Sequence, residues 1–192
     1  MVSATDFIMI FCALELVTIS FYIQVAYLRR SMSSLEAGTK YLILGALSTG
    51  FLVYGITWFF GATGQTNLVA IREVLPLLPV ANHPAILFGL ALVLVALGFK
   101  IAAAPFQFWV PDVYQGAPTP VTAYLAVASK AAGFLVLIRV LEPFFTVPSF
   151  QSKLFLALVL LALLTLIFGN LAAIPQTNFK RLLGYSSIAH AG

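Results

Sequence analysis

Charged residues are scarce in this sequence. Asp, Glu, Lys and Arg together make up 8% of its 192 residues, whereas hydrophobic residues make up 61%. A typical soluble domain carries about 25% charged residues. A soluble protein of the present composition would expose large apolar patches and aggregate. The composition therefore indicates a polytopic membrane protein, with the lipid bilayer as its first partner.

Other absences narrow the chemistry. The single cysteine, Cys12, excludes a disulfide framework and a cysteine-rich metal site. The net charge is +4, but the sequence has no run of Lys and Arg of the kind that binds nucleic acid. No nucleophile–base pair, phosphate-binding loop or metal motif is present. We therefore expect no cofactor, no metal and no nucleic-acid partner on this chain.

Long apolar runs predict an all-α membrane protein with five complete transmembrane helices and the start of a sixth. About 20 helical residues, at about 1.5 Å each, cross the roughly 30 Å hydrocarbon core of a bilayer. We expect a single membrane domain over residues 1–192. Its spans are predicted at residues 5–27, 41–60, 84–104, 120–141, 154–173 and 180–192. The last span is cut short by the chain end, which indicates a fragment of a larger protein.

Prolines and aromatic residues refine this pattern. Residues 68–80 are too few to span a membrane and are expected at its surface. Pro105 removes a backbone donor and is expected to break the third span, which makes the helix discontinuous near Lys100. Trp58 and Trp109 are expected in the aromatic belts at the membrane surfaces.

The loops predict an orientation in the cell's inner (plasma) membrane. Cytoplasmic loops of membrane proteins are enriched in Lys and Arg. The side reached after the first, third and fifth spans carries the larger group of such residues: Arg29, Arg30, Lys40, Lys180 and Arg181. The opposite side carries Arg72, Arg139 and Lys153. We therefore expect Met1 outside and a loop at Pro111–Pro118 in the cytoplasm.

Three ionisable residues, Glu15, Lys100 and Lys130, lie inside the predicted spans. Charging a side chain in hydrocarbon costs about 3 kcal/mol or more. A protonated, hydrogen-bonded Glu15, or lysines that extend to the membrane surface, would be a purely structural explanation. However, Glu15 and Lys130 lie near the middle of their spans, and the carbonyls freed beside Pro105 suit a polar cavity at Lys100. We interpret the three residues as a site that handles ions.

Two further residues are secondary candidates for proton transfer. Lys40 stands at the start of a span, where a lysine more often anchors the helix to the membrane surface. His190 follows Ser186 and Ser187 in a segment of small and polar residues. It could relay protons, and a hydrogen-bonded packing role is equally consistent with its position.

Several motifs carry a resemblance to a known family. Residues 100–120 read K-I-A-A-A-P-F-Q-F-W-V-P-D-V-Y-Q-G-A-P-T-P, and residues 176–188 read Q-T-N-F-K-R-L-L-G-Y-S-S-I. Residues 14–16 and 35–41 match the same pattern upstream. Over nearly its whole length the sequence closely resembles the family of subunit N of proton-pumping NADH–quinone oxidoreductase, respiratory complex I. The motif P-D-V-Y-x-G-A-P-T-P is specific to that resemblance.

The resemblance implies a fold of about fourteen helices built from two inverted repeats with discontinuous helices, of which this chain is a central piece. It implies that Glu15 and Lys100 form a charge pair and that Lys130 lies on a central hydrophilic axis and passes protons onward. The family commonly has His where Gln107 stands, so no proton relay is expected at that position. The implied partners are the other membrane subunits of complex I. Quinone and NADH are expected to be handled by other subunits, so no redox chemistry is expected on this chain.

The sequence leaves two alternatives open. The chain could belong to a multi-subunit cation/proton antiporter, which shares the fold, although the motif at residues 111–120 favours the quinone-oxidoreductase branch. It could also be a structural membrane subunit without a proton path of its own.

Overall fold

Helices account for almost the whole chain, and the computed structural model describes residues 1–192. The nine α-helices are α1 (Phe7–Val25), α2 (Met32–Thr63), α3 (Leu68–Val74), α4 (His83–Ile101), α5 (Trp109–Gly116), α6 (Thr119–Tyr124), α7 (Lys130–Phe145), α8 (Pro148–Ala173) and α9 (Phe179–Ala191). Short 3-10 turns at Leu75–Leu77 and Val80–Asn82 lead from α3 into α4, and a π-helical turn at Leu125–Ser129 joins α6 to α7.

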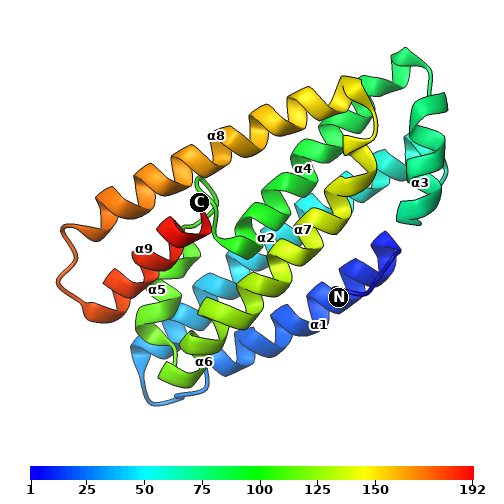
Figure 1. The fold of residues 1–192 in the computed structure, drawn as a ribbon. Helices are drawn as coiled ribbons and strands as arrows, with labels where there is room; N and C mark the ends of the chain where they lie inside the picture. The colour runs from blue at the N-terminus through cyan, green and yellow to red at the C-terminus, as the bar shows by residue number, and fades with distance from the viewer.

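The five predicted membrane helices are confirmed. Five segments are long and apolar enough to cross a membrane: Phe7–Val25, Met32–Thr63, Val80–Ile101, Thr119–Phe145 and Pro148–Ala173. The long helices lie side by side as a bundle (Figure 1). Helix α3 lies at one end of the bundle, and α5 and α6 lie toward the opposite end. Helix α9 runs back along α8, so the C-terminus lies near the middle of the bundle.

Polar side chains set several helix ends. The Asp6 carboxylate accepts a hydrogen bond from the Ile8 amide (2.8 Å), and the Asn67 side chain accepts one from the Val69 amide (2.9 Å). Asn178 caps α9 in the same way. These side chains satisfy amides that have no partner in the first turn of a helix. Gly64 ends α2 with φ 68°, a left-handed conformation that glycine adopts without steric cost.

Helix α2 is longer than the predicted span at residues 41–60. It begins at Met32, where Ser31 caps it, and its 32 residues extend about 48 Å. That length exceeds the hydrocarbon core by several turns. The extra turns precede Tyr41 and place Lys40 within a helix rather than at its start.

The third span is discontinuous, as predicted, but the break differs from the prediction. Helix α4 ends at Ile101 rather than at Ala104, because Ala102 adopts a left-handed conformation with φ 64°. After the break, residues predicted as a loop at Pro111–Pro118 form most of α5. Pro111 lies in the first turn of α5, where its missing N–H would have no helical partner in any case.

Tertiary contacts stabilise this break. The indole nitrogen of Trp109 donates to the Phe99 carbonyl (2.8 Å) in the last turn of α4, which also accepts from the Ala102 amide (3.2 Å). The Thr165 hydroxyl on α8 accepts from the Ala104 amide (2.9 Å). The Trp109 ring also stacks on Tyr41 of α2, with ring centroids 4.7 Å apart. Trp109 is only 2% exposed, so its predicted place in an aromatic belt is wrong.

Candidate functional site

Glu15 and Lys100 line one small cavity between α1, α2 and α4. Its volume is about 30 Å³. The hydroxyl of Thr49 donates to Glu15 Oε1 (2.5 Å), and Thr18 and Ser48 also line the cavity. A cavity that holds a water molecule needs at least about 10–15 Å³ and several polar partners. This cavity meets both conditions, so it can hold a water molecule beside the two residues.

Lys100 is deeply buried, and its ammonium group makes no hydrogen bond within the chain. The residue is 5% exposed, and Nζ has no partner. Glu15 and Lys100 share the cavity without a direct ion pair, since none of the four ion pairs of the chain includes either residue. The helix break explains why the lysine lies there: α4 ends one residue later, at Ile101.

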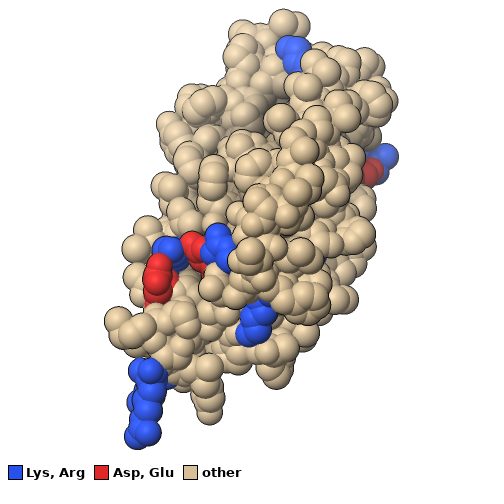
Figure 2. All heavy atoms as spheres, turned by 90° about the vertical axis from the view of Figure 1, so that its left-hand side faces the viewer, with Lys and Arg blue, Asp and Glu red and all other residues tan.

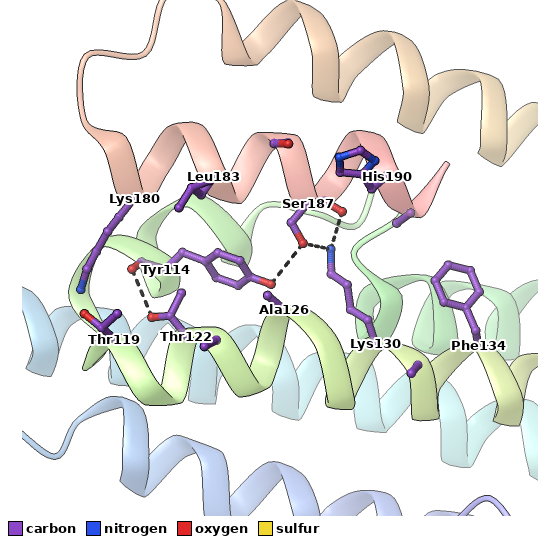
Figure 3. A pocket seen from close by; sticks show the side chains of 14 residues that line it. Tyr114, Thr119, Thr122, Ala126, Lys130, Phe134, Lys180, Leu183, Ser187 and His190 are labelled. Carbon is purple, nitrogen blue, oxygen red and sulfur yellow. Dashed lines mark hydrogen bonds between the residues drawn. The ribbon is translucent and has the colours of Figure 1, made fainter.

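Lys130 lies on α7, directly after the π-helical turn, and is 7% exposed. Its Nζ donates to the backbone carbonyl and to the hydroxyl of Ser187 on α9, both at 2.6 Å (Figure 3). The Ser187 hydroxyl also lies 3.4 Å from the hydroxyl of Tyr114 on α5. A π-helical turn within an α-helix is rare and is frequent at functional sites. Three separate helices therefore build the surroundings of Lys130.

A second, larger cavity opens beside Lys130. Its volume is about 640 Å³, and its walls come from α5, α6, α7 and α9. Lys130, Ser187, His190 and Lys180 are among the polar residues that line it (Figure 3). His190 is exposed and makes no hydrogen bond. The structure thus brings the two candidates Lys130 and His190 to one cavity, and Lys100 and Glu15 to another.

The helices that carry the two lysines touch at Gly133. This residue lies one turn after Lys130 on α7. A Cβ atom built on it would lie 2.9 Å from Ile101 Cγ2 and 3.4 Å from Lys100 Cγ. Only a residue without a side chain allows α7 to lie this close to the stem of Lys100. The two cavities are therefore neighbours, although no side chain joins them.

Lys40 lies away from these cavities, in a cluster of charges at one end of the bundle. Its Nζ pairs with Glu36 (2.7 Å) and with Asp112 of α5 (2.8 Å). Asp112 also pairs with Arg181 of α9. Figure 2 shows charged side chains of both signs gathered toward one end of the face, with only a few charged side chains elsewhere on it. The cluster joins α2, α5 and α9, which suits an anchoring role for Lys40 rather than proton transfer.

The charges of this cluster fix the ionisation of Asp112, which lies outside the membrane-spanning segments. Burial alone would raise the pKa of its carboxyl, but hydrogen bonds from Lys40 and Arg181 outweigh burial and hold that pKa below its usual value. A carboxyl whose pKa is lower in the folded state stabilises the fold above its unfolded pKa of about 3.9. This stabilisation is lost as the pH falls through the lowered folded value.

Asp112→Asn is therefore expected to lower the free energy of unfolding by about 1 kcal/mol, since both ion pairs are partly exposed to solvent. The loss should be constant from about pH 5 to pH 9. It should shrink as the pH falls below about 3.9 and vanish only below the lowered folded pKa, where the wild-type carboxyl is itself neutral. Thermal unfolding in detergent across this range measures it. Glu142→Gln, which removes the exposed pair with Arg72, is the control. A stability difference that persists at the lowest pH would contradict the assignment.

Sequence reasoning missed several of these residues. The sequence identified Ser187 only as a small polar residue near His190. It identified Tyr114 and Asp112 only as members of the motif at residues 111–120. Thr49 gave no signal at all, because a hydroxyl is common in an apolar helix. A hydroxyl in the same sixth span as His190 was the only available hint toward Ser187.

Comparisons with known proteins agree on one family. The family model described as NADH:quinone oxidoreductase/Mrp antiporter, TM, matches residues 4–192. NADH-quinone oxidoreductase subunit N of Dehalococcoides mccartyi is 45% identical over 197 residues, which cover 100% of this chain and 40% of the relative. Subunit N of Desulforamulus reducens is 49% identical over 193 residues, with the same coverage. The chain thus spans about 40% of the length of the curated relatives it matches.

Solved structures show the same fold. A chain of respiratory complex I from Thermus thermophilus with bound aureothin superposes with a TM-score of 0.81 at 43% identity, over 99% of this chain and 39% of that one. A chain of the archaeal membrane-bound sulfane sulfur reductase gives a TM-score of 0.86 at 32% identity, over 98% and 38%. A chain of the Mrp complex from a Dietzia species gives 0.85 at 20% identity, over 97% and 34%, which shows the fold alone.

Proposed function

Because this chain belongs to the NADH:quinone oxidoreductase/Mrp antiporter family of membrane proteins, we propose that it is part of the N subunit of a proton-pumping NADH–quinone oxidoreductase. In this proposal it moves protons across the membrane, and the electron transfer takes place on other subunits. The observation that carries the proposal is the placement of Glu15, Lys100 and Lys130. Each lies on a membrane-length helix and lines a cavity. Ionisable groups at such positions typically mark ion pathways.

The mechanism that we propose is electrostatic. Glu15 and Lys100 share a cavity, so the charge on one changes the proton affinity of the other. Two unit charges about 6 Å apart interact with about 3 kcal/mol at an effective dielectric constant of about 20. That energy changes a proton affinity about hundredfold. Loss or gain of a proton at this pair is then felt by Lys130 across the contact at Gly133.

The other membrane subunits of complex I are the proposed partners, and quinone and NADH are handled by other subunits of the complex in this proposal. The identities of 45% and 49% to N subunits support this branch of the family over a cation/proton antiporter. The same electrostatic coupling would operate in either branch, so the ion carried has to be measured.

Glu15→Gln in the full-length subunit tests the proposed function. Glutamine keeps the size of the side chain and a hydrogen bond from Thr49 but removes the titratable charge. We expect the number of protons pumped per NADH oxidised to fall at least severalfold, and we expect Glu15→Asp to retain most of it. Proton uptake into vesicles and NADH oxidation are measured together on complexes assembled to the same level. Wild-type pumping by Glu15→Gln would support a purely structural subunit.

We propose an orientation in the inner (plasma) membrane with Met1 outside and α5 at the cytoplasmic side. The end of the bundle that holds α5 also carries the larger group of positive residues: Arg29, Arg30, Lys40, Lys180 and Arg181. The opposite end carries fewer: Arg72, Arg139 and Lys153. The positive-inside rule places the first group in the cytoplasm.

A Gln115→Cys variant is expected to react with a membrane-impermeant thiol reagent only from the cytoplasmic side. Gln115 is exposed on α5. The native Cys12 is also exposed and is first replaced by serine. Val80→Cys, at the opposite end of the bundle, is the control and should react only from outside. The reverse pattern would overturn the orientation.

A further inference from the structure

Ser187 offers Lys130 two different acceptors. The backbone carbonyl and the side-chain hydroxyl both lie 2.6 Å from Nζ. The carbonyl can only accept a hydrogen bond, so it favours the charged ammonium group. The hydroxyl can accept through its lone pairs and can also rotate to donate its own hydrogen. The two groups therefore respond differently when Lys130 loses a proton.

A charged lysine has three N–H donors and no acceptor, whereas a neutral amine has a lone pair that accepts. While Lys130 is charged, the Ser187 oxygen accepts from Nζ and its hydrogen is free to point at the Tyr114 hydroxyl, 3.4 Å away. Once Lys130 is neutral, the same hydroxyl can turn and donate to Nζ. A buried polar group without a partner costs about 1–3 kcal/mol, and this rotation avoids that cost in both protonation states.

The surroundings limit this role to Ser187. Tyr114 is fully buried on α5, and Gly184 of α9 lies against it, which holds the two helices in contact. His190 lines the same cavity but makes no hydrogen bond to Lys130. Figure 3 shows the Ser187 hydroxyl between the Lys130 Nζ and the phenolic oxygen of Tyr114.

We propose that the Ser187 hydroxyl, backed by Tyr114, is a positioning residue for proton exchange at Lys130. It holds the ammonium group in the cavity and reverses its hydrogen bond when the proton leaves. The inference rests on the proposed function, because it assumes that Lys130 exchanges protons. It assigns a specific partner to that step.

The test compares Ser187→Ala with Ser187→Thr in the full-length subunit within the assembled complex. Alanine removes the hydroxyl, whereas threonine keeps it. We expect Ser187→Ala to slow pumping-coupled turnover about tenfold, as loss of a hydrogen bond to a charged group predicts, and Ser187→Thr to retain at least half. Tyr114→Phe removes only the longer contact and should cost about twofold. Ser152→Ala, the same substitution at an exposed serine of α8 that does not line the cavity, is the control and should match the wild type.

Wild-type turnover in Ser187→Ala would overturn the inference. Equal losses in the alanine and threonine variants at normal assembly would also overturn it, because they would assign the effect to packing. The Lys130→Ala variant tests the proposed function separately from the role of Ser187. If Lys130→Ala pumps normally, the proposed function fails; if Lys130→Ala is inactive and both Ser187 variants are normal, only the role of Ser187 fails.

Discussion

Lys130→Ala is expected to reduce proton pumping by the full-length subunit more than tenfold while the complex still assembles. The ammonium group is the only charged group that Ser187 binds, and it lies at the wall of the larger cavity. Alanine removes the buried ammonium group from that wall, whereas His190 and Lys180 remain elsewhere on the lining of the cavity. The small neighbours on α7 should keep the helix in place, since alanine is a good helix former.

The measurement compares proton translocation in vesicles with the amount of assembled complex. Lys153→Ala is the matched control: it is the same substitution on an exposed residue in the first turns of α8. We expect this control to pump normally. Normal pumping by Lys130→Ala at normal assembly would remove Lys130 from the proton path.

The second large effect concerns the Glu15 and Lys100 pair. Glu15→Gln and Lys100→Met should each damage pumping, because each leaves the other charge in the membrane without a counter-charge. Removal of one partner of a buried pair typically costs about 3–5 kcal/mol. The double variant should be less damaging than the sum of the two losses, since no uncompensated charge remains.

A double-mutant cycle scored on coupled turnover measures this interaction. The two residues share a cavity without a direct ion pair, so the expected coupling is that of two charges across a small polar space. Strict additivity would mean that the residues act independently and that the pairing implied by the family is wrong here. Thr57→Ala, a change on an exposed part of α2, combined with Lys100→Met, is the control and should be additive.

The lengths of the apolar runs were enough to predict the number of membrane helices. A helix that crosses the hydrocarbon core needs a minimum number of apolar residues, and that number can be counted in the sequence. Local sequence was less informative about where helices break. The third span was predicted to end next to Pro105, but it ends at Ile101. There Trp109 donates a hydrogen bond to the Phe99 carbonyl, and Thr165 accepts one from the Ala104 amide. Both partners lie on other helices, so no local pattern could reveal them.

The charged residues of the candidate site could be predicted from the sequence, but the side chains that surround them could not. Glu15, Lys100 and Lys130 stand out because charge is expensive in hydrocarbon. Which of them share a cavity depends on how the helices pack. Trp109 shows the same limit: an aromatic residue beside a helix end fits a membrane-surface belt equally well, and only its stacking on Tyr41 places it inside the bundle.

The hydrogen bond between Thr165 and the Ala104 amide has a mechanical consequence. It attaches the bend after α4 to α8, and the Trp109 indole attaches the end of α4 to α5. A movement of α8 along its axis would therefore pull on the bend after α4 and, through it, on the end of α4 that carries Lys100. The largely exposed helix α8 is thus connected, through the Thr165 hydrogen bond, to the helix end that carries a buried lysine.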